Sequence, residues 1–289
     1  MFKKLRLALA MIKFSHTIFA LPFALGAGLL AAERAGGIAQ NGGRWLLFIL
    51  LAMIGARSAA MTFNRIVDLR YDRQNPRTQS WPLVSGALGL PFAWGFFLAA
   101  SALFIFAAWR LNPLAFQLSP AALAIICFYS LTKRFTSFTH FFLGLSLGIA
   151  PIGAWVAVTG RIEWPALALG LAVLLWVAGF DLIYHCQDIT IDKQLGLHSL
   201  PVKLGIKSAL ILSVILHLLM MAALVATGMG LGLGPAYFSG LGLLGLILAW
   251  EHTLVTPSDL SRINAAFFTL NGWVAMLFLA AVAADFLLR

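Results

Sequence analysis

Charged side chains are scarce in this chain, since Asp, Glu, Lys and Arg together make up only 10% of its 289 residues. Soluble globular domains carry roughly 25% charged and about 45–50% apolar residues. This sequence is instead 61% hydrophobic, with a mean hydropathy of +0.93. A soluble fold could not bury so much apolar surface, so we expect an all-α polytopic membrane protein whose main solvent is the lipid bilayer.

Cysteine is almost absent as well. Cys127 and Cys186 lie far apart in the sequence, which excludes both a disulfide framework and a cysteine metal site. The net charge of +10 does not indicate a nucleic-acid partner, because no basic polar domain is present to hold a duplex. Basic loops are instead typical of membrane proteins.

Long apolar stretches follow one another along the whole chain. A hydrocarbon core of about 30 Å needs roughly 20 apolar residues per helix. The sequence predicts nine spans, at residues 15–32, 44–63, 89–109, 113–131, 139–159, 164–184, 208–228, 231–250 and 264–286. Basic residues precede the first stretch, as in a signal peptide, but we interpret it as a retained span. We expect one transmembrane domain over residues 1–289.

The distribution of Lys and Arg predicts the orientation. If the N-terminus is cytoplasmic, the inside segments carry 14 of these residues and the outside segments 5, with Arg57 within the second span. Cytoplasmic loops of membrane proteins carry the excess of positive charge. We therefore expect a cytoplasmic N-terminus and an external C-terminus.

Half of the ten acids lie in two short segments, NRIVDLRYD at 64–72 and DLIYHCQDITID at 181–192. Each segment follows an even-numbered predicted span, so both should emerge on the cytoplasmic face. Two acid clusters on one face can converge in space although they are distant in sequence. The acids concerned are Asp68, Asp72, Asp181, Asp188 and Asp192.

Both segments have helical spacing. Steps of four place Asn64, Asp68 and Asp72 on one helix face, and steps of three and four do the same for residues 181, 184, 188 and 192. Acids so close together and so near a membrane core are costly unless a cation compensates them. Oxygen ligands suit a hard divalent ion, and Mg²⁺ commonly bridges carboxylates to substrate phosphates. We therefore expect Mg²⁺ here.

Basic residues on the same side would bind the phosphate oxygens that the metal leaves free. A diphosphate at the membrane surface, beside so many apolar helices, predicts an apolar remainder, and a polyprenyl diphosphate fits. The basic residues concerned are Arg65, Arg70, Arg73, Arg77, Lys133, Arg134 and Lys203.

The two acidic segments resemble the aspartate-rich motifs of the UbiA superfamily of intramembrane aromatic prenyltransferases. The resemblance covers most of the chain, and the nearest branch is the 4-hydroxybenzoate polyprenyltransferase-like one. Its other elements are MIKFSHTIFALPFA near the N-terminus, NPRT and PLVSG after the first motif, FYSLTKRFT around Lys133, and HSLPVKLG after the second motif.

The resemblance implies the roles of individual residues. Tyr184 and Asp181 match positions near the reacting centre. Mg²⁺ would be held jointly by the diphosphate and by Asn64, Asp68, Asp72, Asp188 and Asp192. The catalytic residues would be Asp68, Asp72, Asp181, Tyr184, Asp188 and Asp192. The diphosphate contacts would be Asn64, Arg65, Arg77, Lys133, Arg134 and Lys203. One position departs from the family pattern: Trp81 stands where the family usually has an arginine before Pro-Leu.

The resemblance also implies the reaction, which is transfer of a polyprenyl group to an aromatic acid such as 4-hydroxybenzoate in ubiquinone biosynthesis. The implied location is a bacterial inner membrane, with the active site on the cytoplasmic face. The aromatic rings of Tyr129, Tyr184 and nearby Phe residues would stabilise an allylic cation. The alternative acceptor is a naphthoate, for menaquinone, with homogentisate, haem and a glycerol phosphate also open.

Two alternatives of another class remain, a transporter and a lipid-binding protein. Intramembrane charge often marks an ion path, but here the acids lie at helix ends on one face and no inverted repeat is evident. The histidines near the cytoplasmic ends are interpreted as structural, and His185 is expected to point away from the acid face. These histidines are His16, His140, His185 and His198.

Overall fold

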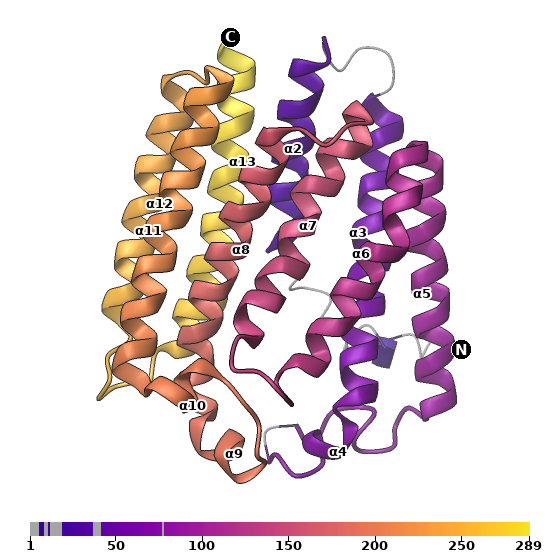
Figure 1. Cartoon of the computed structure of the whole chain (residues 1–289), viewed down its shortest axis with the longest axis vertical. Helices are drawn as coiled ribbons and strands as arrows, with labels where there is room; N and C mark the ends of the chain where they lie inside the picture. The colour runs from indigo at the N-terminus through magenta and orange to yellow at the C-terminus, as the bar shows by residue number, and fades with distance from the viewer. Residues whose placement is uncertain (1–5, 9–10, 12–18, 37–41, 77) are drawn as a thin grey trace.

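The computed structural model describes residues 6–8, 11, 19–36, 42–76 and 78–289. Within this part of the chain, long helices run side by side and short ones gather at one end (Figure 1). The long helices are α2 (Ala20–Arg34), α3 (Gly42–Val67), α5 (Leu90–Leu111), α6 (Pro113–Thr132), α7 (Thr139–Thr159), α8 (Trp164–His185), α11 (Ile206–Leu231), α12 (Pro235–Leu254) and α13 (Asn271–Leu288). The expected all-α membrane fold is confirmed.

The short elements are α4 (Leu69–Asp72), α9 (Ile189–Gln194), α10 (Leu200–Leu204), the 3₁₀ turn η2 (Cys186–Asp188) and the π-helix η3 (Ala265–Leu270). Helices α4, α9 and α10 lie at the lower end of the bundle in Figure 1, and the C-terminus lies at the opposite end. Local sequence explains many of the helix limits. Proline occupies the first turn of α5, α6, α8 and α12, where its missing amide costs nothing.

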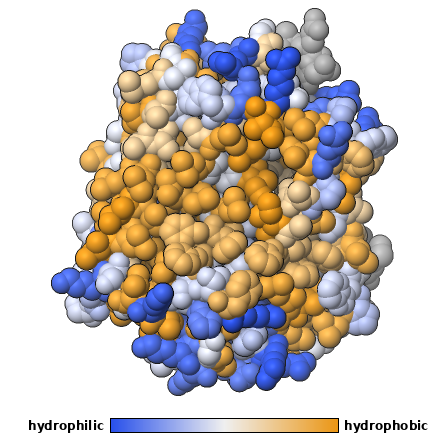
Figure 2. Space-filling view, in the orientation of Figure 1, coloured by the Kyte–Doolittle hydropathy of each residue, from blue (hydrophilic) through white to orange (hydrophobic). Residues whose placement is uncertain are grey.

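The protein is an integral membrane protein. Seven of the described helical segments are long and apolar enough to cross a bilayer, namely α3, α5, α6, α7, α8 continued to Gln194, α11, and η3 with α13. Each of the nine expected spans overlaps one long helix, and their number remains a prediction. Figure 2 shows an apolar belt between two hydrophilic ends. Large side chains of the belt are open to lipid: Leu98, Leu218 and Leu246 are 62%, 64% and 68% exposed.

Helix α8 forms the centre of the bundle. It packs against α7 on one side and α11 on the other, while α2 packs against α7 and α13, and α3 packs against α5 and α6. Aromatic rings fill the core between these helices: the ring of Phe23 stacks on Phe278 at 4.3 Å and lies 5.0 Å from Trp176. The acid-bearing end of α8 therefore continues from the most deeply buried of the seven candidate spans among the described residues.

The contact between α7 and α8 depends on glycine. A side-chain carbon on Gly148 would lie 2.5 Å from the carbonyl oxygen of Gly170, which no real contact tolerates. The two backbones can approach this closely only because neither residue has a Cβ atom. This approach brings the N-terminal end of α7 against the C-terminal end of α8, where the second acid cluster begins.

Candidate active site

The first acid cluster lies where α3 ends and α4 begins. The amides of Asp68 and Asp72 donate to the carbonyl oxygens of Asn64 and Asp68, each at 2.9 Å, so the helical repeat continues through the junction. Asn64, Asp68 and Asp72 are all buried, and Asn64 Nδ2 donates to Asp68 Oδ2 at 3.1 Å. The spacing of four residues thus turns all three side chains toward one cavity.

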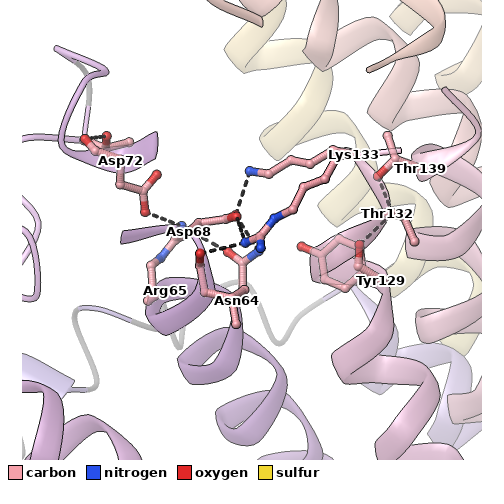
Figure 3. Close-up of polar contacts among 11 residues, drawn as sticks. Asn64, Arg65, Asp68, Asp72, Tyr129, Thr132, Lys133 and Thr139 are labelled. Atoms are coloured by element: carbon pink, nitrogen blue, oxygen red, sulfur yellow. Dashed lines mark hydrogen bonds and ion pairs between the residues drawn. The ribbon is translucent and has the colours of Figure 1, made fainter. Parts of the chain in front are cut away.

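Two cations from the end of α6 reach the buried carboxylate of Asp68 (Figure 3). Lys133 Nζ donates to Asp68 Oδ2 at 2.6 Å. A guanidinium nitrogen of Arg134 donates to Asp68 Oδ1 at 3.3 Å and to the carbonyl of Val67 at 2.6 Å. A carboxylate that is only 2% exposed requires such compensation. The two cations therefore lie beside one of the carboxylates that the resemblance assigns to the metal.

Arg65 connects the first acid cluster to the loop that follows it. Its guanidinium donates to Asn64 Oδ1 at 3.2 Å and lies 3.9 Å from Asp72 Oδ2. The same guanidinium lies over the ring of Trp81, 3.6 Å from the centroid. The residue that departs from the family pattern thus contacts a cation of the site instead of providing one.

The second acid cluster is less regular than its spacing predicts. Helix α8 ends at His185, the 3₁₀ turn η2 follows, and α9 begins at Ile189. The prediction of one continuous helix face over residues 181–192 is therefore wrong, because the chain tightens into a 3₁₀ turn at Cys186–Asp188. The turn still leaves Asp181, Asp188 and Asp192 around the same cavity.

Asp181 forms hydrogen bonds with two histidines. His140 Nδ1, from α7, lies 2.7 Å from Asp181 Oδ2, and His185 Nδ1 lies 3.3 Å from Asp181 Oδ1. The expectation that His185 points away from the acids is wrong, since His185 lines the same cavity as they do. The sequence carried a signal for this contact, because His185 is four residues after Asp181 on the same helix. No comparable signal linked His140 to Asp181 across 41 residues.

A polar cavity of about 390 Å³ brings the two acid clusters together. The predicted residues that line it are Asn64, Arg65, Asp68, Asp72, Lys133, Asp181, Tyr184, Asp188 and Asp192. Residues from α3, α4, α6, α7, α8 and α9, from η2 and η3, and from the segments that connect them thus surround one space. All four carboxylates assigned to the metal by resemblance face it.

Three predicted diphosphate contacts are not among the described residues that line the polar cavity. Arg134 reaches Asp68 but is not among the described residues that line the cavity. Lys203 is exposed on α10, one turn beyond Ser199, which does line the cavity. Arg77 lies outside the described residues. The expected basic side of the site is therefore represented at the cavity wall by Arg65 and Lys133, with Arg57 as a further cation.

Aromatic rings form one wall of the polar cavity, and the sequence did not predict most of them. The ring of Tyr184 lies 4.1 Å from that of Phe267 and 5.9 Å from that of Phe268. Both phenylalanines belong to the π-helix η3, whose wider turn is common at functional sites. Asn271 Nδ2 donates to the carbonyl of Ala266 at 3.0 Å and so holds this turn.

A second, apolar cavity of about 240 Å³ continues from the polar one between α3, α5, α6 and α7. The two cavities share a boundary formed by Arg57, Met61, Tyr129, Leu143 and Leu147. Beyond this boundary the lining consists mainly of Ala, Leu and Ile side chains. A ligand with a charged head and a long apolar tail matches this pair of spaces.

Comparison with known proteins gives one consistent match. A family model described as the UbiA prenyltransferase family matches residues 20–282. The 4-hydroxybenzoate octaprenyltransferase of Nitrosospira multiformis is 32% identical over 84% of this chain and 83% of its own. The enzyme of the same name from Xanthomonas campestris is 32% identical over 85% of this chain and 81% of its own.

Solved structures agree with the family match. The apo structure of a UbiA homologue from Aeropyrum pernix is 36% identical, with a TM-score of 0.83 over 94% of this chain and 98% of its own. A UbiA homologue from Archaeoglobus fulgidus, bound to DMAPP and Mg²⁺, is 20% identical, with a TM-score of 0.71 over 98% of this chain and 99% of its own. The second likeness concerns the fold alone.

Proposed function

The chain belongs to the UbiA prenyltransferase family and is a prenyltransferase that acts on an aromatic acceptor, and from this premise we propose its substrates, metal and mechanism. The proposed reaction is Mg²⁺-dependent transfer of a polyprenyl group from polyprenyl diphosphate to an aromatic acid such as 4-hydroxybenzoate, in quinone biosynthesis. The family assignment replaces the transporter and lipid-binding alternatives.

One observation carries the proposal: a polar cavity with two acid clusters and three cations opens into an apolar cavity between the helices. The polar part suits a diphosphate, and the apolar part suits a prenyl chain. The boundary between them, at Tyr129 and Met61, would then lie near the C–O bond that breaks. The substrates named for relatives, DMAPP and 4-hydroxybenzoate, support both halves of this assignment.

The donor set fits Mg²⁺. Carboxylates from Asp68, Asp72, Asp188 and Asp192 line the polar cavity, and the site therefore offers hard oxygen ligands of the kind that this ion prefers. When bound, the metal would neutralise charge that develops on the departing diphosphate. Mg²⁺ bound to the UbiA homologue from Archaeoglobus fulgidus supports this choice.

The cations of the site would bind the leaving group. Lys133 and Arg134 contact Asp68 and would bind phosphate oxygens beside that carboxylate. Arg65, held over Trp81, offers a planar fork suited to phosphate. Hydrogen-bond donors that already point to the place where charge develops in the transition state commonly make the largest single contribution to catalysis.

The apolar residues would protect the reactive prenyl end. Heterolysis of the allylic C–O bond leaves both bonding electrons on diphosphate and an allylic cation on the prenyl group. The faces of Tyr129, Tyr184 and Phe267 would stabilise this cation, while the surrounding apolar side chains exclude water that would quench it. A ring carbon of the acceptor then forms the new C–C bond.

The acceptor pocket would lie beside the aromatic wall of Tyr184, Phe267 and Phe268. A hydroxybenzoate ring fits its chemistry, and the names of the bacterial relatives support that choice. A naphthoate remains the second candidate, for menaquinone synthesis. We place the protein in a bacterial inner membrane with the cavity at the cytoplasmic face, which the excess of Lys and Arg on that side supports.

The test uses purified protein in lipid nanodiscs with geranyl or longer prenyl diphosphates. Each donor is offered with 4-hydroxybenzoate and, separately, with a hydroxynaphthoate, in Mg²⁺ or in EDTA. We expect prenylated 4-hydroxybenzoate, detected by mass spectrometry, only with Mg²⁺. If product forms only with the naphthoate, the acceptor is a naphthoate and not 4-hydroxybenzoate. Full activity in EDTA would contradict the metal assignment.

A further inference from the structure

A buried hydrogen-bonded cluster at the contact of α7 and α8 has no part in the metal and diphosphate roles described above. Asp181 is 4% exposed and His140 is fully buried, whereas the side chain of His185 is 29% exposed and lines the polar cavity. The rings of His140 and His185 meet edge to face, with centroids 4.9 Å apart. The cluster therefore joins a buried carboxylate to one imidazole that faces the substrate space.

The partners of His185 determine which of its nitrogens carries hydrogen. Nδ1 lies 3.0 Å from the carbonyl oxygen of Asp181 and 3.3 Å from its carboxylate. A carbonyl oxygen only accepts, so Nδ1 is the donor. In the neutral ring Nε2 then holds a lone pair, and no described residue donates a hydrogen bond to it. This is the tautomer of a general base oriented by a carboxylate.

His140 fixes the carboxylate from the other side. Its Nδ1 lies 2.7 Å from Asp181 Oδ2, and the backbones of α7 and α8 approach closely at Gly148. Asp181 is thus held between two imidazoles. Its negative charge stabilises an added proton on His185, as a carboxylate does for a neighbouring imidazolium.

We propose that Nε2 of His185 accepts the proton that leaves the acceptor ring after the new C–C bond forms. Asp181 and His140 act as positioning residues. The ring C–H bond breaks, its electron pair restores the aromatic ring, and the proton passes to His185 and then to cavity water. The electrons of the broken C–O bond stay on diphosphate, so no oxidant or reductant is needed. This inference rests on the proposed function.

Other groups around the cavity are less suited to this step. Asp188 and Asp192 belong to the metal set, and the amine of Lys133 is a donor to Asp68. The ring of Tyr184 packs against that of Phe267, 4.1 Å away, as part of the aromatic wall. His198 also lines the cavity, but it has no described hydrogen bond to a carboxylate. His185 lines the same cavity and stands next to Tyr184 in the chain, one turn before Asp188.

The same three side chains could be considered a metal site, since one ligand atom of each lies within 4.8 Å of the others. Both Nδ1 atoms, however, are already directed at the carboxylate of Asp181, at 2.7 and 3.3 Å. A metal would have to replace these contacts. Metal analysis of the purified protein distinguishes the two interpretations.

The test measures the isotope effect on product formation with 4-hydroxybenzoate that carries deuterium at both positions next to the hydroxyl. The donor is geranyl diphosphate, with Mg²⁺ present. In H185Q we expect the rate to fall by roughly 10²–10⁴-fold, the usual contribution of a general base, and the isotope effect to rise above the wild-type value because proton loss becomes limiting. D181N should also lower the rate and raise the isotope effect, but by smaller amounts.

Affinity for geranyl thiolodiphosphate, an unreactive donor analogue, should be unchanged in H185Q, which separates lost chemistry from lost binding or folding. H198Q is the matched control and should keep the wild-type isotope effect. H185N provides a second variant at the same position if H185Q does not fold. An isotope effect in H185Q equal to that of the wild type would overturn the inference.

Metal analysis of the purified protein provides an independent arm. A stoichiometric transition metal that is present in the wild type and lost in D181N would also overturn the inference, in favour of a metal site. If the wild type forms no prenylated product, the proposed function itself fails. Product formation without a changed isotope effect refutes only the role of His185.

Discussion

The guanidinium of Arg65 lies over the indole ring of Trp81, 3.6 Å from its centroid. This contact gives a role to the one position at which the chain departs from the pattern of its family. A tryptophan there supplies no charge, but its negative ring face fixes the charge that Arg65 supplies. The ring and Asp72 together hold the guanidinium at the edge of the polar cavity.

Replacement of Trp81 should therefore weaken binding of the prenyl diphosphate. A partly desolvated cation–π contact is worth about 1–2 kcal/mol, so W81A should raise KM for geranyl diphosphate by roughly 5- to 30-fold. W81F should retain much of the wild-type affinity because it keeps a ring face. W273A, at an exposed tryptophan on α13, is the control. A wild-type KM in W81A would show that the contact does not position Arg65.

Loss of the Asp68 carboxylate should abolish most of the activity. Asp68 accepts hydrogen bonds from Lys133, Arg134 and Asn64, so D68N removes a proposed metal ligand and also leaves two cations without their anionic partner. We expect kcat/KM to fall at least 100-fold, the low end of what a group that stabilises transition-state charge contributes. Added Mg²⁺ should not restore it. Prenyl transfer in membranes, followed by mass spectrometry, measures the effect.

Asp259 offers a matched control for that substitution. It lies in the loop between α12 and α13, where hydrogen bonds from Ser261 lower its pKa. It is exposed and is not among the described residues that line the cavity. D259N should retain wild-type activity. Equal losses in D68N and D259N would point to a general charge effect on the membrane protein.

The apolar cavity should limit the length of the prenyl chain. Gly153 on α7 lines this cavity, and no atom lies within 4 Å of the position that its Cβ would occupy. G153L should therefore fill free space without a clash. We expect a raised KM for geranyl and longer diphosphates, with little change for DMAPP. The measurement is KM across donors of increasing length.

Gly95 on α5 is the control for Gly153. It also has free space around its Cβ position and is not among the described residues of either cavity. G95L should leave the preference for chain length unchanged. If G153L also leaves it unchanged, the prenyl tail takes another route through the helices.

Asn271 should be important for stability and for the aromatic wall together. Its side chain accepts from Trp176 Nε1 at 2.6 Å and donates to Glu251 Oε1 and to the carbonyl of Ala266, both at 3.0 Å. N271A leaves these fully buried groups without their partner. This should lower the free energy of unfolding by roughly 1–3 kcal/mol for each group. We expect a lower Tm in detergent and a lower kcat, because η3 no longer holds Phe267 against Tyr184.

One control variant and one contrary outcome complete the N271A experiment. T253A removes a hydroxyl from the exposed face of α12 and should change neither quantity. A normal kcat in N271A, despite a lower Tm, would mean that the π-helix does not depend on Asn271 for the geometry of the site.

Particular residues show how much of the site the sequence could predict. The spacing of Asn64, Asp68 and Asp72 predicted their common orientation, because a helix repeat is a local property of the backbone. The same reasoning missed the 3₁₀ turn at Cys186–Asp188, since the way α8 ends depends on what packs against it. His140 could not be assigned to Asp181 from the sequence, because nothing local links α7 to α8.

The sequence by itself determined the membrane environment, the helical class and the two acid segments, because these follow from composition and from short-range periodicity. It also marked Trp81 as unusual without indicating a reason. Only the tertiary structure decided that Trp81 contacts Arg65, that Asp181 lies between two histidines, and that the polar and apolar cavities share a boundary. These contacts join helices distant in the chain, and side-chain packing between helices depends on the whole fold.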